Sequence, residues 1–247
     1  MAMAMKVTYN TDGPVGRITL SNPPSNTLTH PAFADGQELA RYLATPALKA
    51  VIVSGAGRHF CAGADLAALR AQARDAAGLA EALARGKAVL DLIRFAPVPV
   101  IAAIRGSCLG AGLEIALACH FRVAAATAML GFPESDHGLI PGLAGTLAES
   151  VRRGALVRLV LGGGMVNGTE ALGMGLVDRA VPVRDVEREA VALAESLIGR
   201  RSADLVHAAM TSIHNGSRMP REEALRRETE LFCGLAKRQA AHGGEGA

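Results

Sequence analysis

Hydrophobic residues in the first half of the chain occur in short runs bounded by glycine and proline, a pattern typical of β-strands. The first two runs flank Asp12-Gly13 and predict a β-hairpin. The next two are almost continuously apolar, as expected of strands buried on both faces of a parallel sheet. Together with two shorter runs, the predicted strands cover residues 7–9, 15–20, 49–55, 98–104, 121–124 and 128–131.

Alanine-rich or amphipathic segments between and after these runs predict helices. The segment 66–95 should break near Gly78 and Gly86, and residues 106–110 should form a glycine turn. Residues 162–182 predict a turn, a helix, a second turn and a short strand. The predicted helices cover residues 31–45, 66–95, 111–119, 141–161, 186–198, 203–214 and 220–240.

The alternation of strands and helices predicts an α/β fold. With 247 residues the chain can form one large domain or two small ones. It has no linker rich in serine, proline or charge and no internal repeat, so we expect one α/β domain over residues 1–185. Residues 186–247 should form a helical region suited to packing against another subunit.

Composition narrows the classes of function. Half of the residues are hydrophobic but only 3% are aromatic, so the core should consist mainly of alanine, leucine, valine and isoleucine. The net charge of +3, without a Lys/Arg run, argues against nucleic-acid binding and suits an anionic small molecule. No apolar run reaches the ~18 residues of a membrane helix, and the first seven residues are too short for a signal peptide. The spacing of Cys61, Cys108, Cys119 and Cys233 predicts a reducing cytoplasm.

Two acidic residues stand in apolar surroundings. Glu114 lies in a predicted helix where a core helix would carry a hydrocarbon, and Glu134 follows Gly131-Phe132-Pro133. Carboxyl groups in poorly solvated positions are candidates for an acid/base pair.

Two strand-to-helix turns, at residues 60–66 and 106–114, place small residues where a helix begins. Unpaired N–H groups at such positions can hold an anion. If the N–H groups of Ala64 and Ala111 converge, they would form an oxyanion hole for a thioester or ester enolate. The alternative interpretation is that the small residues serve close packing alone.

In order and spacing, five motifs resemble those of the crotonase superfamily, the enoyl-CoA hydratases and isomerases. The likeness covers about residues 6–240. VGRITLSNPPSNTL is similar to the family's strand and Asn-Ala-Leu signature, HFCAGADL to its first oxyanion segment, and PVIAAIRGSCLGAGLEIALAC to its second. FPESDHGLIPGLAGT resembles the segment of the second glutamate, and NGTEALGMGLVDRAVP resembles a later signature.

The resemblance implies a crotonase-like ββα spiral with a C-terminal helical trimerisation region, assembled as a trimer or a dimer of trimers. It implies an acyl-CoA substrate, no cofactor beyond the CoA moiety and no metal. Glu114 and Glu134 would be catalytic, and the N–H groups of Ala64 and Ala111 would bind the thioester oxygen. The expected substrate contacts are Asn26, Leu28, Ala62, Gly63, Asp65, Leu66 and Gly110. Family isomerases tend to lack the first glutamate, so the presence of both favours an enoyl-CoA hydratase.

The chain also departs from the family pattern. Ala111 and Ala144 stand where glycine is usual, and His120 stands where aspartate is common and is expected to be structural. Asp136 and His137 replace apolar residues; they would indicate a more polar substrate if they faced the pocket, but a surface position is favoured. The chain also lacks the basic ending common in the family, which leaves the C-terminal contribution to CoA binding open.

Other functions fit parts of the sequence. Within the family, the chain could be an isomerase, a decarboxylase or a thioester hydrolase. Residues 106–110 match G-x-C-x-G, which would make Cys108 the nucleophile of a hydrolase with His137 or His207 as base. Gly55-Ala56-Gly57 lacks the full dinucleotide-binding pattern. A noncatalytic oligomeric scaffold is a further alternative.

Overall fold

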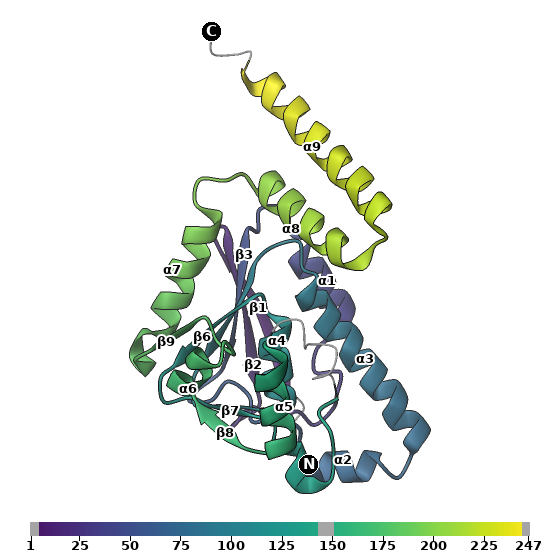
Figure 1. Cartoon of the computed structure of the whole chain (residues 1–247), viewed down its shortest axis with the longest axis vertical. Helices are drawn as coiled ribbons and strands as arrows, with labels where there is room; N and C mark the ends of the chain where they lie inside the picture. The colour runs from purple at the N-terminus through teal and green to yellow at the C-terminus, as the bar shows by residue number, and fades with distance from the viewer. Residues whose placement is uncertain (1–4, 143–150, 244–247) are drawn as a thin grey trace.

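The computed structural model describes residues 5–142 and 151–243 (Figure 1). Its main sheet has six strands in the order β1-β2-β3-β4-β6-β9. β1 and β2 form the predicted antiparallel hairpin, and every later pairing in this sheet is parallel. The strands are β1 (Lys6–Asp12), β2 (Val15–Ser21), β3 (Ala50–Gly55), β4 (Val100–Ile104), β6 (Phe121–Ala125) and β9 (Arg179–Val181). β4 is buried along its whole length, as its continuous apolar run indicates.

A second sheet of three short strands lies beside the first, in the order β5-β7-β8. β7 (Met129–Gly131) was expected, but β5 (Ser107–Leu109) and β8 (Met165–Asn167) fall in segments predicted as turns. Those predictions were wrong because a strand of three residues has little hydrophobic pattern of its own and forms only by pairing with another strand. β5 pairs in parallel with β7, and β7 pairs in antiparallel with β8.

The N-terminal helices differ from the prediction at their boundaries. α1 (Gly36–Leu43) is shorter than expected because Asp35 caps it, accepting a hydrogen bond from the Glu38 N–H. The predicted helix 66–95 is split into α2 (Leu66–Gln72) and α3 (Ala76–Arg94).

The split between α2 and α3 falls at residues 73–75, not at the two glycines. The side chain of Asp75 caps α3 by accepting a hydrogen bond of 3.0 Å from the Gly78 N–H. Gly86 continues the helix and permits a close approach, since a Cβ there would lie 2.7 Å from the carbonyl oxygen of Pro31.

The remaining helices follow the predicted order. The predicted helix 141–161 differs from the structure at its start: residues 141–142 and 151–152 are not helical, and residues 143–150 lie outside the described residues. α7 spans the predicted residues, whereas α8 and α9 run further than expected, and Figure 1 shows α9 extending from α8 away from the sheet. These elements are α4 (Ala111–Ala118), the 3₁₀ helix η1 (Pro133–His137), α5 (Arg153–Gly162), α6 (Gly168–Gly173), the 3₁₀ helix η3 (Val183–Asp185), α7 (Val186–Ile198), α8 (Ala203–Arg218) and α9 (Arg221–Gly243).

His120 makes the kind of contacts expected of a structural residue. Its Nδ1 accepts a hydrogen bond of 3.0 Å from the Val100 N–H, at the start of β4. Its ring lies 5.3 Å from that of His214 on α8, measured between centroids. Burial chiefly lowers the pKa of His120 to about 4, so the ring is neutral at ordinary pH and suited to this packed position.

The core is built mainly from alanine, valine, leucine and isoleucine side chains, as the composition predicts. No helix within residues 5–142 and 151–243 combines the length and the apolar character that crossing a bilayer requires.

Asn26 fastens the loop after β2 to the loop after β3. Its side chain is almost fully buried, and its Nδ2 donates to the carbonyl oxygens of Ala56 at 2.9 Å and His59 at 2.8 Å. Its Oδ1 accepts from the Asn22 N–H at 2.9 Å. Asn26 also adopts a φ of 56°, a left-handed conformation that asparagine tolerates better than most residues. The side chain therefore holds the segment that leads into the site.

Replacing Asn26 with alanine should lower the free energy of unfolding by about 2–4 kcal/mol, because it removes several hydrogen bonds and leaves buried carbonyl groups unpaired. Urea unfolding measures the change. Gln37→Ala, at an exposed position of α1, is the control and should change stability by no more than about 0.5 kcal/mol. Equal stability of the two variants would contradict the anchoring role.

Candidate active site

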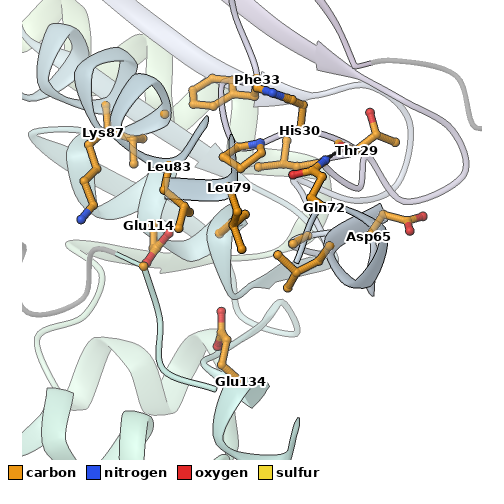
Figure 2. Close-up of a pocket in the computed structure, with 18 of the residues that line it drawn as sticks. Thr29, His30, Phe33, Asp65, Gln72, Leu79, Leu83, Lys87, Glu114 and Glu134 are labelled. Carbon is orange, nitrogen blue, oxygen red and sulfur yellow. Dashed lines mark hydrogen bonds between the residues drawn. The ribbon is translucent and has the colours of Figure 1, made fainter. Parts of the chain in front are cut away.

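A cavity of about 230 Å³ lies between α2, α3, α4 and η1 (Figure 2). Six of the predicted site residues line it: Leu28, Ala64, Asp65, Ala111, Glu114 and Glu134. Five do not: Asn26, Ala62, Gly63, Leu66 and Gly110. Their contact with a substrate stays a prediction, but several of them shape the walls. Within the described ranges, no group of three or more His, Cys, Asp or Glu side chains is arranged to hold a metal ion.

Main-chain pairing brings the two predicted turns together. Cys61 and Cys108 form a parallel bridge, in which the Leu109 N–H donates to the Cys61 carbonyl oxygen at 3.0 Å. Gly63 follows with a φ of 95°, and a Cβ at this position would lie 2.8 Å from the Leu109 carbonyl oxygen and 3.7 Å from the Ala111 nitrogen. Only glycine fits both this conformation and this separation.

The N–H groups of Ala64 and Ala111 are available at this junction. Leu28 pairs with the residues on either side of Ala64, donating to the Gly63 carbonyl oxygen and accepting from the Asp65 N–H, each at 2.8 Å. Ala111 is the first residue of α4, so its N–H has no acceptor within the helix. Neither N–H donates to another group in the described part of the chain. The two groups therefore meet the chemical requirement for binding an oxygen anion.

Glu114 enters the cavity from the first turn of α4. Its side chain is buried, with the residue 6% exposed. The other residues of α4 are alanine, glycine, leucine or isoleucine. A Cβ on Gly142 would lie 3.8 Å from its Oε1, which places the carboxyl group beside this glycine. A carboxylate in the first turn of a helix interacts favourably with the helix dipole, which partly offsets the loss of solvation.

Glu134 enters the same cavity from η1. Its Oε1 lies against Gly110, where a Cβ would approach it to 2.5 Å, and its buried Oε2 has no hydrogen-bond partner among the described residues. Burial raises the pKa of this carboxyl group, while its own main-chain N–H and the nearby His137 act in the opposite direction. Glu134 thus keeps its proton to a higher pH than an ordinary glutamic acid. Figure 2 shows both glutamates directed into the cavity from different elements.

The structure does not support Cys108 as a nucleophile. Its side chain is fully buried, does not line the cavity, and has its sulfur 3.6 Å from the Gly112 carbonyl oxygen. Burial raises the pKa of the thiol, which favours the unreactive protonated form. Of the proposed bases, His207 contacts the Leu48 carbonyl oxygen at 2.8 Å, and His137 is exposed on η1.

Asp136 and His137 do not face the cavity. Both are exposed, and the carboxyl group of Asp136 lies against Gly163, where a Cβ would be 2.5 Å from its Oδ1. This is the surface position that the sequence favoured. These two residues therefore give no indication of a polar substrate.

Sequence reasoning missed the wall that α3 supplies. Leu79, Leu83, Lys87 and Leu90 line the cavity from this helix. Their spacing of four, four and three residues places them on one helical face, and this spacing was visible in the sequence. What the sequence could not show is that this face covers a cavity rather than the core.

Comparison with protein families and with curated proteins gives consistent matches. A family model described as enoyl-CoA hydratase/isomerase matches residues 10–246. The chain is 34% identical over 227 residues to a "Probable enoyl-CoA hydratase" of Bacillus subtilis, covering 88% of this chain and 85% of that protein. It is 39% identical over 220 residues to the "Fatty acid oxidation complex subunit alpha" of Shewanella halifaxensis, covering 83% of this chain but only 30% of that much longer protein.

Solved structures with similar folds cover nearly the whole chain. An enoyl-CoA hydratase from Polaromonas is 31% identical with a TM-score of 0.82, and the match covers 97% of this chain and 94% of that one. A putative enoyl-CoA hydratase from Thermobifida fusca, solved in complex with CoA, is 27% identical with a TM-score of 0.78 and covers 95% and 94% of the two chains.

Replacing Glu134 with glutamine should stabilise the folded protein at neutral pH. The folded state raises the pKa of Glu134, so it binds the proton more tightly than the unfolded chain does. Stability therefore falls as pH rises from the unfolded pKa of about 4.3 through the folded pKa, and glutamine removes that loss. Thermal unfolding of both proteins across this range measures it. A variant that is less stable than the wild type at neutral pH would contradict the burial of an ionisable group here.

Replacing Gly63 with alanine should lower kcat/KM by about a hundredfold, because the added Cβ forces apart the segments that carry Ala64 and Ala111. Gly57→Ala is a matched control: Gly57 also has a positive φ, of 70°, but a Cβ there meets nothing within 4 Å. The control should lose about 1–2 kcal/mol of stability and keep its activity. Equal activity of the two variants would show that the close approach is unimportant.

Proposed function

The chain belongs to the enoyl-CoA hydratase/isomerase family and has the crotonase fold of its structural relatives, and we propose that it is an enoyl-CoA hydratase. The observation that carries this proposal is the presence of Glu114 and Glu134 in one cavity with two available main-chain N–H groups. The name of the Bacillus subtilis relative and the CoA-bound Thermobifida structure support an acyl-CoA substrate.

The N–H groups of Ala64 and Ala111 would receive the thioester oxygen of a 2-enoyl-CoA. Attack at Cβ moves negative charge onto this oxygen, so donors placed there stabilise the enolate more than the substrate. Loss of one such donor from an oxyanion hole typically costs about 2.7–4 kcal/mol of transition-state stabilisation.

The two glutamates would divide the proton transfers. Glu114 accepts a proton from water as the water oxygen bonds to Cβ, and Glu134 donates a proton to Cα. The raised pKa of Glu134 suits the donor, because it increases the fraction that carries a proton. The proton gained by Glu114 then returns through solvent to Glu134, which leaves the enzyme unchanged.

A second candidate within the family is an isomerase, which moves a proton between two carbon atoms and needs one carboxyl group for it. The arrangement of two glutamates around the cavity favours hydration, because adding water requires both an acceptor and a donor. A decarboxylase or thioester hydrolase acting on an acyl-CoA would use the same oxyanion donors and is tested by the same panel of substrates.

We propose that the protein acts in the cytoplasm and that the helices of residues 186–247 join copies of the chain into a trimer or a dimer of trimers. Large apolar side chains are exposed on these helices, including Ile213 on α8 and Phe232 on α9. Contact with further copies would remove such surface from water.

Glu114→Gln and Glu134→Gln should each lower kcat for hydration by about 10²–10⁴-fold, because each change removes a proton acceptor or donor. The assay is the loss of conjugated-enoyl absorbance with a panel of 2-enoyl-CoA thioesters. Glu195→Gln, at an exposed position of α7, controls for the loss of a surface charge. Full activity of either site variant would refute that residue's role. A wild-type protein that shifts double bonds or releases CoA without hydrating would refute the hydratase assignment.

A further inference from the structure

Lys87 interrupts an apolar stripe on the cavity side of α3. The residues of α3 that line the cavity are Leu79, Leu83, Gly86, Lys87 and Leu90. Lys87 is four residues after Leu83 and three before Leu90, so the three side chains lie on one face of the helix. Lys87 is an exposed residue, so it brings an ammonium group to the rim of a cavity whose neighbouring α3 positions present hydrocarbon.

The charges around the cavity make this lysine conspicuous. Three acidic residues line the cavity, Asp65, Glu114 and Glu134, and Lys87 is the one lysine or arginine among the described lining residues. It makes no hydrogen bond or ion pair with another described residue. Asp65 is engaged as the cap of α2, where it accepts from the Ala68 N–H at 2.8 Å. The rim of the cavity therefore offers a bound ligand a cation that has no ion-pair partner among the described residues.

The position of Lys87 indicates which part of the substrate it meets. The proposed thioester site is formed by Ala64 and Ala111, and Asp65 follows directly after the first of these. Figure 2 shows Asp65 and Lys87 on opposite sides of the cavity, with Leu79 and Leu83 between them. With the CoA moiety leaving the cavity on the Asp65 side, a thioester held at Ala64 would extend its acyl group along the leucines toward Lys87.

We propose that Lys87 binds a carboxylate at the far end of the acyl group, and that the substrates are 2-enoyl-CoA thioesters of dicarboxylic acids. This inference rests on the proposed function and names its substrate class. A carboxylate there would neutralise the ammonium group, and the adjoining leucines would contact the methylene carbons between the two ends. The acidic residues lining the cavity would repel an anionic acyl group that lacked such a partner.

A different role for Lys87 makes a different prediction. Its charge could act on Glu114, which enters the cavity from α4, and thereby assist hydration of every substrate. Loss of the lysine would then lower activity with all acyl groups by the same factor. A carboxylate subsite instead changes the ratio between substrates that differ at the far end alone.

The test compares kcat/KM for two 2-enoyl-CoA thioesters of equal chain length, one ending in a carboxylate and one in a methyl group. The wild type should prefer the carboxylate. Lys87→Leu should lower the carboxylate-to-methyl ratio by about 10–100-fold, the range expected for one hydrogen-bonded contact to a charged group. Lys87→Arg should retain most of the preference. Arg85→Leu removes a cation from α3 at a position that does not line this cavity and should leave the ratio unchanged.

Binding separates the subsite from the reaction. The saturated acyl-CoA thioesters of the same two types cannot be hydrated, and calorimetry gives their dissociation constants. A preference for the carboxylate that disappears in Lys87→Leu would support the subsite even if the hydratase assay failed. Equal loss with both acyl types, or a wild-type preference for the methyl-ended chain, would overturn the inference.

Discussion

The structure depends on the main-chain pairing between residues 60–64 and 107–111. These segments follow β3 and β4, neighbouring parallel strands, and the bridge between Cys61 and Cys108 continues their alignment beyond the sheet. The pairing ends where Gly63 passes the Leu109 carbonyl oxygen. The Gly110 N–H then donates to the Gly131 carbonyl oxygen at 2.9 Å, whereas the N–H groups of Ala64 and Ala111 have no main-chain acceptor among the described residues. A side chain at residue 63 would prevent this arrangement. The placement of these two N–H groups is therefore a property of the backbone and is insensitive to most side-chain changes nearby.

The two glutamates share a cavity but are held by different means. Glu114 is fixed by a helix that is buried along almost its whole length, so its position is determined by core packing. Glu134 stands on a short 3₁₀ helix, with one carboxyl oxygen against Gly110 and the other buried without a partner among the described residues. The second arrangement destabilises the ionised form. Two residues of the same type thus stand in different surroundings, and it is Glu134 whose protonated form the protein favours.

The sequence predicted the parts of the fold that have a strong local pattern. The continuous apolar runs became β3 and β4, and the amphipathic pattern of α7 gave both of its ends. It failed where partners far along the chain decide the structure, as in β5 and β8. It also misplaced the break between α2 and α3, because the Asp75 cap outweighed the helix-breaking tendency of glycine. The motifs selected Glu114 and Ala64, which both line the cavity, but did not select Lys87, because what a helical face packs against is known only once the fold is known.

The four cysteines differ sharply in their surroundings. Cys61, Cys108 and Cys119 are buried, and burial raises the pKa of each thiol, whereas Cys233 is exposed on α9. Electrophilic reagents attack the exposed thiolate in preference to a buried thiol. A fluorophore or spin label would consequently attach to the folded protein at Cys233, far along the chain from either glutamate, and would report on the C-terminal helix without first removing the native cysteines.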